Sequence, residues 1–427
     1  MHEAPQRVVV IGGGFGGLRT ALHLAKRRAY DVVLIDRSDV HVYTPWLYEI
    51  ASGRTDHASA TSERVLRHSA GIPLKRIVDG TGIRLRIASV VGVDVAHRHV
   101  VFADGTTVGY DALVIAAGSE TAYFGIPGLE EHALTIKSVA DTQRVHACMT
   151  SVLRAVKRGE SAHVMVGGAG PSGAELVGEL ATMVRARVRR GALPAGKVQF
   201  TLVDAASSLF PTYPPAVARK TERRFRAIGV QMLLDTMVTK VTDHHVTLTP
   251  RPPKDAVPSH APLHAATEVP VSCFVWCGGV TPSKLTAALP LPKDARGRIT
   301  TDATFEVTGT VNIFALGDIA VFASPNAVPL PQTAQAADEV SGAVALNVVR
   351  ALARRALVPY VPPKTWPFVV AIGGRYGVGY LWGMCVSGFF AYAIRRAADL
   401  RYLFRILPPV AAYRVWRSRM RLYAEND

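Results

Sequence analysis

Apolar stretches that lead into glycine clusters and then into helical patterns occur twice along the chain. In the first, VVVIGGGFGGLRTALHLA at residues 8–25, the pattern predicts a strand over 7–11, a glycine turn, a helix over 17–28 and a second strand over 31–35. The second, HVMVGGAGPSGAELVGEL from residue 163 on, is followed by a long basic helix and by the strand VQFTLVDAA. Strands that alternate with helices in this way predict an α/β protein built on parallel sheets.

The first glycine cluster has the spacing of a dinucleotide-binding turn. Gly12, Gly14 and Gly17 fit G-x-G-x-x-G, in which the glycines allow a tight turn, close approach of the backbone to a pyrophosphate, and close packing of helix on strand. Free N–H groups at the start of the helix then favour the negative charge of the pyrophosphate. Asp36 ends the second strand, where a carboxylate accepts hydrogen bonds from ribose hydroxyls.

The second cluster repeats the first with Gly168, Gly170 and Gly173, and Asp204 ends the strand that follows. This aspartate comes later than the usual spacing of about 20 residues, and the extended helix and the RGALPAGK turn account for the excess. Two alanines follow Asp204, so no arginine stands beside it to bind a 2′-phosphate, and we expect NADH rather than NADPH. Two such units predict two dinucleotides, a flavin in the first and a nicotinamide donor in the second.

The segments around the second unit complete the pattern. The D-G turn in VVFADGTTVGYDALVIAAGSE predicts a hairpin, and YDALVIAAG predicts a buried strand that ends at Gly118. A loop rich in proline and histidine (249–270), a strand in VSCFVWCGGV and the segment TVNIFALGDIA come later. His260 and His264 in the loop lack the spacing of a metal site, so we expect a surface connection and no bound metal.

Composition narrows the classes of function. The 427 residues, 49% of them hydrophobic, suffice for two or three domains. The net charge of +16 favours anionic partners, and because no DNA-binding motif is present we expect nucleotides and a membrane surface rather than nucleic acid. Four cysteines without a C-x-x-C pair, and an N-terminus that begins a strand, indicate a reducing cytoplasmic setting. The longest apolar run, 377–394, is rich in glycine and is marginal against the about 20 residues of a spanning helix, so we do not expect it to cross a membrane.

The motifs resemble those of flavoproteins that bind two dinucleotides, a family that includes pyridine-nucleotide–disulfide reductases, ferredoxin reductases and quinone reductases. YDALVIAAG looks like that family's A-T-G linker strand, with Ala117 in place of threonine, and TVNIFALGD looks like its second flavin motif. The stretches LIDRSDVHVYTPWLYEIASG, FGIPGLEEHALTIKSVADT, GAGPSGAELVGELA, WCGGV and PLPQTAQAADEVSG together resemble type II NADH dehydrogenases, over about residues 7–342. The resemblance implies non-covalent FAD, NADH as the donor, a membrane quinone as the acceptor and no proton pumping.

The resemblance also implies roles for individual residues. Asp318 matches the carboxylate that binds the ribityl chain, although a helix-start aspartate also serves as an N-cap. Glu175 matches the family's functional glutamate, although the helix dipole alone favours an acid there. Ala334 and Gln335 match the quinone motif A-Q-x-x-x-Q, but Glu339 at its last position changes the polarity expected of a quinone pocket. The expected catalytic residues are Glu175 and Gln335, and the expected cofactor-binding residues are Gly12, Gly13, Gly14, Phe15, Gly16, Gly17, Asp36, Arg37, Pro45, Val90, Ala117, Gly118, Gly168, Gly170, Gly173, Asp204, Gly279, Gly317, Asp318, Ala334 and Gln335.

Cysteine positions argue against two related classes. Disulfide reductases and sulfide:quinone oxidoreductases need a pair of redox-active cysteines. The region directly after Asp36, where a disulfide reductase would carry its pair near the flavin, contains no cysteine. Cys273 and Cys277 on one strand would lie roughly 13 Å apart, beyond the about 7 Å that a disulfide permits between Cα atoms. A soluble NAD(P)H-dependent ferredoxin or rubredoxin reductase stays open as an alternative, as does a non-enzymatic redox sensor.

The C-terminal region separates a quinone reductase from a soluble reductase. After Lys364, apolar and aromatic residues alternate with arginines, a composition typical of helices in a membrane interface. The apolar residues are Trp382, Phe389, Phe390, Tyr392, Leu403, Phe404 and Trp416, and the arginines are Arg395, Arg396, Arg401, Arg405, Arg414, Arg417, Arg419 and Arg421. We expect peripheral attachment to an anionic lipid surface at the cytoplasmic face of the cell membrane; a helical cap or a homodimer contact is the alternative.

The predicted fold is therefore α/β, with two Rossmann-like dinucleotide-binding domains, the second inserted in the first, and a mostly helical C-terminal segment that associates with membrane. The expected divisions are 1–145 and 291–350 for the FAD-binding domain, 146–290 for the NAD(H)-binding domain and 351–427 for the membrane-interface region.

Overall fold

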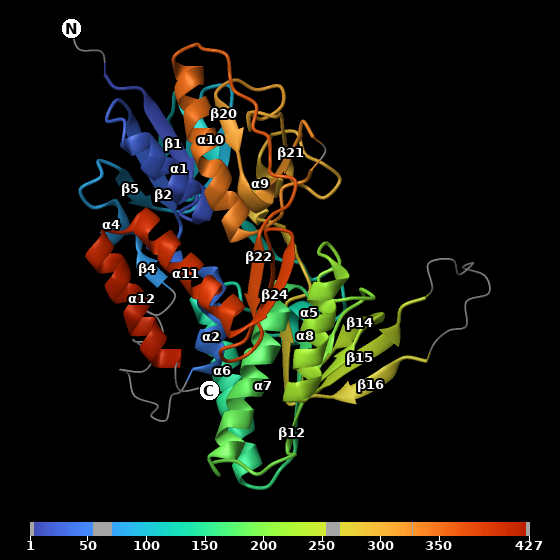
Figure 1. Ribbon diagram of the computed structural model, residues 1–427. Helices are drawn as coiled ribbons and strands as arrows, with labels where there is room; N and C mark the ends of the chain where they lie inside the picture. Colours follow the sequence, from blue (N-terminus) through green and yellow to red (C-terminus); the bar gives the residue numbers. More distant parts are fainter. Residues whose placement is uncertain (1–3, 54–70, 253–264, 327, 424–427) are drawn as a thin grey trace. The chain divides into compact units, whose positions relative to one another are not determined.

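The computed structural model describes residues 4–53, 71–252, 265–326 and 328–423 (Figure 1). The chain forms two compact units, each assembled from three separate segments. Unit 1 consists of Met1–Tyr43, Gly71–Glu120 and Val280–Trp366, and unit 2 consists of Thr44–Ala70, Thr121–Gly279 and Pro367–Asp427. The last segment of the chain thus belongs to unit 2.

A five-stranded parallel sheet forms the centre of unit 1, in the order β20-β9-β1-β2-β5. Its strands are β1 (Arg7–Ile11), β2 (Asp31–Asp36), β5 (Arg84–Ile87), β9 (Ala112–Ile115) and β20 (Ile313–Ala315). Val9, Ile11 and Val33 pack on one face against an antiparallel meander of β6 (Val90–Asp94), β7 (His99–Phe102) and β8 (Thr107–Gly109). The alternate residues are buried as well, and helix α1 (Phe15–Ala25) packs on the sheet beside α10 (Ala334–Leu352). Because both faces are covered, the central strands are apolar throughout.

Shorter elements complete unit 1. They are β3 (Val40–Val42), β4 (Gly71–Pro73), α4 (Leu74–Val78), β18 (Val280–Pro282), α9 (Lys284–Ala288), β19 (Ile299–Thr301), η2 (Gly317–Ile319) and β21 (Ala320–Phe322). The chain leaves the unit through β10 (Ser119–Thr121).

Unit 2 repeats this architecture with a four-stranded parallel sheet in the order β13-β12-β11-β17. Its strands are β11 (Ala162–Gly167), β12 (Val198–Val203), β13 (Val230–Leu233) and β17 (Cys273–Trp276). One face packs in a common core with α6 (Val139–Lys157), α7 (Pro171–Arg189) and α8 (Pro215–Ile228). The other face packs against the antiparallel strands β14 (Thr236–Val241), β15 (His245–Pro250) and β16 (Thr267–Pro270). The remaining short helices are η1 (Thr44–Trp46), α2 (Leu47–Ser52) and α5 (Leu129–His132).

The C-terminal segment is an integral part of unit 2. It begins with an antiparallel sheet that the sequence did not predict, β22 (Phe368–Ala371), β23 (Gly377–Leu381) and β24 (Met384–Gly388), and continues into α11 (Phe389–Ile406) and α12 (Pro409–Tyr423), which pack on each other. The glycine-rich apolar run thus forms two strands and the start of a helix. In the described part of the chain, no helix is long and apolar enough to span a bilayer.

Most elements predicted from the sequence are confirmed. The strands around both glycine clusters, the D-G hairpin as β7–β8, and the strands β9 and β17 occur where expected. Helix α1 begins two residues before the expected start because extended Gly14 is its N-cap. The predicted loop contains strand β16, and its histidines His260 and His264 lie outside the described residues.

Candidate functional site

The first glycine turn joins β1 to α1 and has the geometry of a pyrophosphate cradle. Gly12 has φ 108°, a conformation that L-residues disfavour. A Cβ on Gly17 would lie 2.0 Å from the Gly12 carbonyl oxygen, so the helix is packed too closely on the turn for a side chain. At Gly14, by contrast, no described atom beyond the adjacent chain lies within 4 Å of a Cβ. Open space at a helix N-terminus is the environment that a pyrophosphate requires.

Asp36 stabilises this turn from the end of β2. Its Oδ2 accepts a hydrogen bond from Gly13 N at 2.5 Å, and its Oδ1 accepts one from Ser38 N at 2.8 Å. His41, which the sequence did not single out, lies with Nδ1 2.9 Å from the Gly13 oxygen. Burial lowers the pKa of His41 to about 4, so the imidazole is neutral at physiological pH. A histidine between two valines of a short apolar strand was the only sequence signal for it.

The other predicted residues of unit 1 lie on three further segments. The Ser119 hydroxyl donates a hydrogen bond to Asp318 Oδ2 at 2.5 Å. This bond connects the segment that follows β9 to the second flavin motif. A Cβ on Gly16 would lie 2.9 Å from Leu316, which precedes Gly317 and Asp318. This contact brings the second motif to the start of α1.

The predicted quinone motif lies on the first turns of α10, with Gln335 and Glu339 at exposed positions. The helix starts with Ala334, after the N-cap Thr333. Arg37 forms a loose ion pair with Glu120, at 3.8 Å between nitrogen and oxygen. The remaining predicted residues of unit 1 are Phe15, whose ring lies edge-on to His41, Val90 at the start of β6, and Ala117 and Gly118 after β9.

The second glycine turn, between β11 and α7, has nearly the same geometry as the first. Gly168 has φ 101°, and a Cβ on Gly173 would lie 1.9 Å from the Gly168 oxygen. Gly170 is the N-cap and again has space around it among the described atoms. Asp204 Oδ2 accepts from Ala169 N at 2.6 Å, and Oδ1 accepts from Ala206 N at 2.7 Å. This turn therefore has the geometry of a second dinucleotide cradle.

Glu175, in the second turn of α7, is a buried acid with a strongly perturbed pKa. Its Oε1 accepts a long hydrogen bond from Ala371 N at 3.4 Å and lies 3.6 Å from the Arg395 guanidinium. Burial raises the pKa of Glu175 to about 7, against the lowering effect of Arg395, and the carboxylates of Asp399 and Glu49 raise it further. The acid therefore exchanges its proton near neutral pH, as a group that supplies protons in catalysis must.

Arg395 connects Glu175 to the segment that contains Pro45. Its guanidinium donates to the Pro45 oxygen at 3.2 Å and lies 3.6 Å from Asp399. Arg395 was expected among the basic residues of a membrane-interface surface, but its side chain is only 16% exposed and makes its contacts within unit 2. An arginine so close to Glu175 in space but remote in sequence left no local signal.

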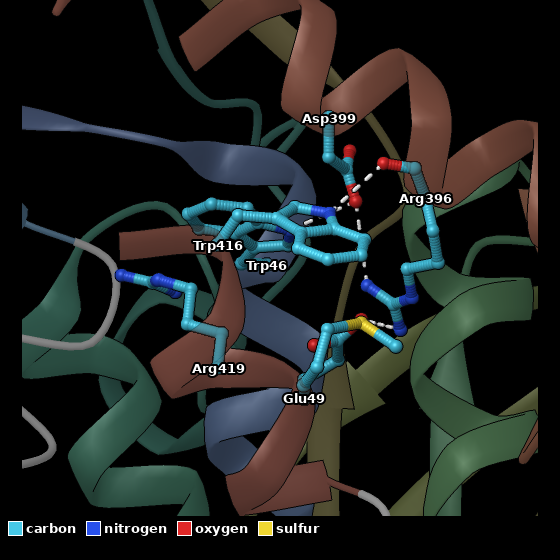
Figure 2. Close-up of a pocket in the computed structure, with 7 residues that line it drawn as sticks. Trp46, Glu49, Arg396, Asp399, Trp416 and Arg419 are labelled. Atoms are coloured by element: carbon cyan, nitrogen blue, oxygen red, sulfur yellow. Dashed lines mark hydrogen bonds and ion pairs between the residues drawn. The ribbon is translucent and has the colours of Figure 1, made fainter. Parts of the chain in front are cut away.

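A buried cluster of charged and aromatic residues attaches α11 and α12 to α2 (Figure 2). Arg396 pairs with Glu49 and with Asp399, the latter at 3.3 Å. The Trp46 indole donates to Asp399 at 3.0 Å, and the Arg419 guanidinium lies 3.7 Å from the centre of the Trp46 ring.

The cavity between these side chains holds about 10 Å³, roughly the space of a single water molecule. It is far too small for an organic ligand, so the cluster serves packing. Arg396 and Arg419 are also buried, at 9% and 4% exposed, which corrects their expected place among the arginines of a membrane-interface surface.

The comparisons with known proteins match this geometry. Residues 6–339 match the family described as pyridine nucleotide-disulphide oxidoreductase. The chain belongs to this family. It is 29% identical to the demethylphylloquinone reductase NdbB of Synechocystis sp., over 95% of this chain and 93% of that protein. It is 26% identical to a type II NADH:quinone oxidoreductase of Staphylococcus aureus, over 95% of this chain and 97% of that protein. The resemblance to type II NADH dehydrogenases found in the motifs is confirmed.

Solved structures show the same fold. NDH2 from Plasmodium falciparum in complex with NADH superposes with a TM-score of 0.81 at 16% identity, covering 99% of both chains. The sulfide:quinone oxidoreductase from Aquifex aeolicus superposes with a TM-score of 0.77 at 18% identity, covering 94% of this chain and 91% of the other. The predicted fold of two Rossmann-like domains is therefore confirmed.

Proposed function

We propose that this chain transfers electrons from NADH through non-covalently bound FAD to a quinone, without pumping protons. The observation that carries the proposal is the pair of glycine turns, one in each unit, with matched φ angles, matched open N-caps and an aspartate bonded to each turn. Relatives named as NADH:quinone oxidoreductases over nearly the whole chain support the assignment of donor and acceptor.

We assign FAD to unit 1 and NADH to unit 2. Unit 1 carries the second motif at Gly317 and Asp318, which Ser119 links to the β9 strand region. This assignment keeps the domain boundaries expected from the sequence, at residues 145, 290 and 350. FAD, when bound, supplies the hydride acceptor that also passes electrons on singly or in pairs.

The residues of the protein bind and orient the two dinucleotides, and they move protons. The turns at Gly14 and Gly170 bind pyrophosphate. Asp36 and Asp204 are positioned to accept hydrogen bonds from ribose hydroxyls. Reduction of a quinone to a quinol takes up two protons with two electrons. We assign the handling of a proton to Glu175, because its pKa of about 7 lets the carboxyl both hold and release it near neutral pH. We assign Gln335 to the quinone side on the motif alone.

Anaerobic stopped-flow reduction tests the function. NADH should bleach the flavin absorbance, and a soluble quinone analogue should restore it in a second mixing step. The result that contradicts the proposal is a flavin that NADH reduces but that a ferredoxin or rubredoxin, and not a quinone, reoxidises.

We further propose that unit 2 attaches to an anionic membrane through one surface of the C-terminal segment, at the cytoplasmic face of the cell membrane. Large apolar residues are exposed in this segment, which also carries the exposed Arg401, Arg414 and Arg417. The apolar residues are Trp382, Met384, Phe389, Phe390, Phe404, Val410 and Tyr413. Apolar residues beside arginines are the composition of an interfacial surface, and each arginine near an anionic leaflet contributes about 1 kcal/mol.

Point variants test the attachment better than truncation, because removal of α11 would also remove the half-buried Arg395 and the buried Arg396 and Asp399. The triple variant Trp382→Ser, Phe389→Ser, Phe390→Ser should sediment less with vesicles of phosphatidylglycerol, and salt should weaken the wild type only in part. Val311→Ser, which removes an equally exposed apolar residue of unit 1, is the matched control. Equal binding of the triple variant and the wild type to vesicles would contradict attachment through this surface. A dimer in the wild type that the triple variant dissociates would also contradict it and would favour a homodimer contact.

A further inference from the structure

Phe124 is an exposed aromatic residue with a disfavoured backbone conformation. Its side chain is 67% exposed and its φ is 52°, in the left-handed region. Bulky L-residues rarely adopt this conformation, and where they do the surrounding structure holds them for a functional reason more often than elsewhere. The residue lies just after β10, in the Thr121–Gly279 segment of unit 2.

The neighbours of Phe124 hold its ring at the end of strand β17. Trp276 donates its indole N–H to the Ala122 oxygen at 2.8 Å, and Ala122 N donates to the Gly279 oxygen at 3.1 Å. The Phe124 ring lies edge-on to the Trp276 ring, with centroids 6.5 Å apart. A Cβ on Gly279 would lie 2.7 Å from Phe124 Cζ, so the ring rests directly on a glycine backbone.

The backbone that precedes Gly279, on which this ring rests, contacts the glycine turn of unit 2. A Cβ on Gly168 would lie 2.5 Å from the Cys277 carbonyl and 2.6 Å from Gly278 Cα. Strands β11 and β17 are parallel neighbours with Gly167 opposite Trp276, so the turn and the Phe124 ring occupy the same edge of the sheet. Dinucleotides bind at this carboxyl edge of a parallel sheet.

We propose that Phe124 is a binding residue of the dinucleotide donor, and that the nicotinamide ring of NADH packs on its exposed ring face. The inference rests on the proposed function, in which the turn at Gly170 and Asp204 hold the ADP-ribose half. The nicotinamide is a planar aromatic ring, and an exposed ring held beside side-chain-free glycines offers it an apolar surface and room for the carboxamide. Phe124 thus distinguishes the nicotinamide half of the donor from the adenosine half.

Three variants of the full-length holoprotein separate the ring from the backbone. Phe124→Ala removes the ring, Phe124→Gly removes it and also relieves the positive φ, and Phe124→Tyr keeps an aromatic ring. The apparent Kd of NADH comes from the concentration dependence of anaerobic flavin reduction, and the Ki of ADP-ribose, which lacks the nicotinamide, comes from competition in the same assay.

The Ala and Gly variants should bind NADH about tenfold more weakly, with flavin content and the Ki of ADP-ribose unchanged, and Phe124→Tyr should stay near the wild type. An unchanged Kd for NADH in Phe124→Ala, or an equal loss of affinity for NADH and ADP-ribose, would overturn the inference. Competition by ADP-ribose would in either case still support the NADH site of the proposed function. Absence of that competition in the wild type would overturn the proposed function itself.

Discussion

Helices α1 and α7 start in the same way and differ at one equivalent buried position. Both follow a glycine with φ near 100°, and both have an extended glycine as N-cap. In each helix a further glycine, Gly17 or Gly173, packs directly on the first glycine of the turn. At the second residue after that later glycine, α1 carries Arg19 and α7 carries Glu175. The two side chains are equally buried, at 6% exposed each, and have opposite charges.

The surroundings of the two charges lead to different chemistry. Arg19 has a close ionic partner, with its Nε 2.8 Å from Asp338 Oδ1. Among the described residues, Glu175 has a 3.6 Å ion pair and a 3.4 Å hydrogen bond, both longer than the Arg19 contact, and burial raises its pKa to about 7. The same helix position thus stabilises the packing of α1 on α10 in unit 1 and provides a titrating acid in unit 2. Turn geometry selects a dinucleotide, and the interior of the helix decides what else the site can do.

The largest effect should follow from filling the open N-caps. Gly14 and Gly170 have φ −73° and −72°, which any residue adopts, and space for a side chain. Gly14→Leu should therefore fold but lose FAD, giving colourless protein. Gly170→Leu should keep FAD and lose about 100-fold in the rate of flavin reduction by NADH. The visible spectrum and stopped-flow reduction check this pair, and FAD in Gly14→Leu or rapid reduction in Gly170→Leu would break the symmetry of the two turns.

Removal of one partner from the buried ion pair of unit 1 should cost stability. Arg19→Met leaves the Asp338 carboxylate in a buried position, which should lower the free energy of unfolding by about 3–5 kcal/mol. The double variant Arg19→Met, Asp338→Leu should regain much of the loss. Chemical denaturation with FAD in excess measures both. A single variant as stable as the wild type would mean that the pair is not the packing element described above.

The equivalent position in unit 2 should change the pH dependence of stability. Because the pKa of Glu175 is about 7 when folded and about 4.5 when unfolded, the folded chain holds a proton that the unfolded chain releases. Stability therefore falls as pH rises from about 4.5 to 7, by about 3 kcal/mol from this group. Glu175→Gln should show a correspondingly flatter profile in denaturation experiments at several pH values. It should also slow quinone reduction near neutral pH, and an unaltered rate would exclude the proton-handling role.

The smallest effect concerns the aspartates at the two turns. Asp204→Asn should reduce the preference for NADH over NADPH in kcat/KM by about tenfold, because the amide accepts fewer bonds and no longer repels a 2′-phosphate. Asp36→Asn changes the matching carboxylate in unit 1 and should leave the preference unaltered in the fraction that retains FAD. A wild type that prefers NADPH would contradict the assignment of Asp204.

The two glycine turns were predictable because their requirements are local. Gly12, Gly14 and Asp36 are set by the turn and by adjacent strands, and the same holds for Gly168 and Asp204. The partners of Glu175 were not predictable, because Arg395 comes near it only through the packing of α11 in unit 2. The arginines of the C-terminal helices look alike in sequence, and only the fold separates buried Arg396 and Arg419 from exposed Arg401. The strands β22–β24 were missed for a similar reason, since glycine-rich apolar residues there resemble an interfacial stretch.

The three-segment construction of unit 2 has a consequence for its biosynthesis. Trp46 is translated 353 residues before Asp399, and Glu49 likewise precedes its partner Arg396 by a long stretch of chain. At about 5–20 residues per second, the earlier residues wait roughly 20–70 s for these partners. The emerging chain therefore carries an incomplete unit 2 until α11 is made, and a stop codon before Arg396 removes structural residues rather than a dispensable tail.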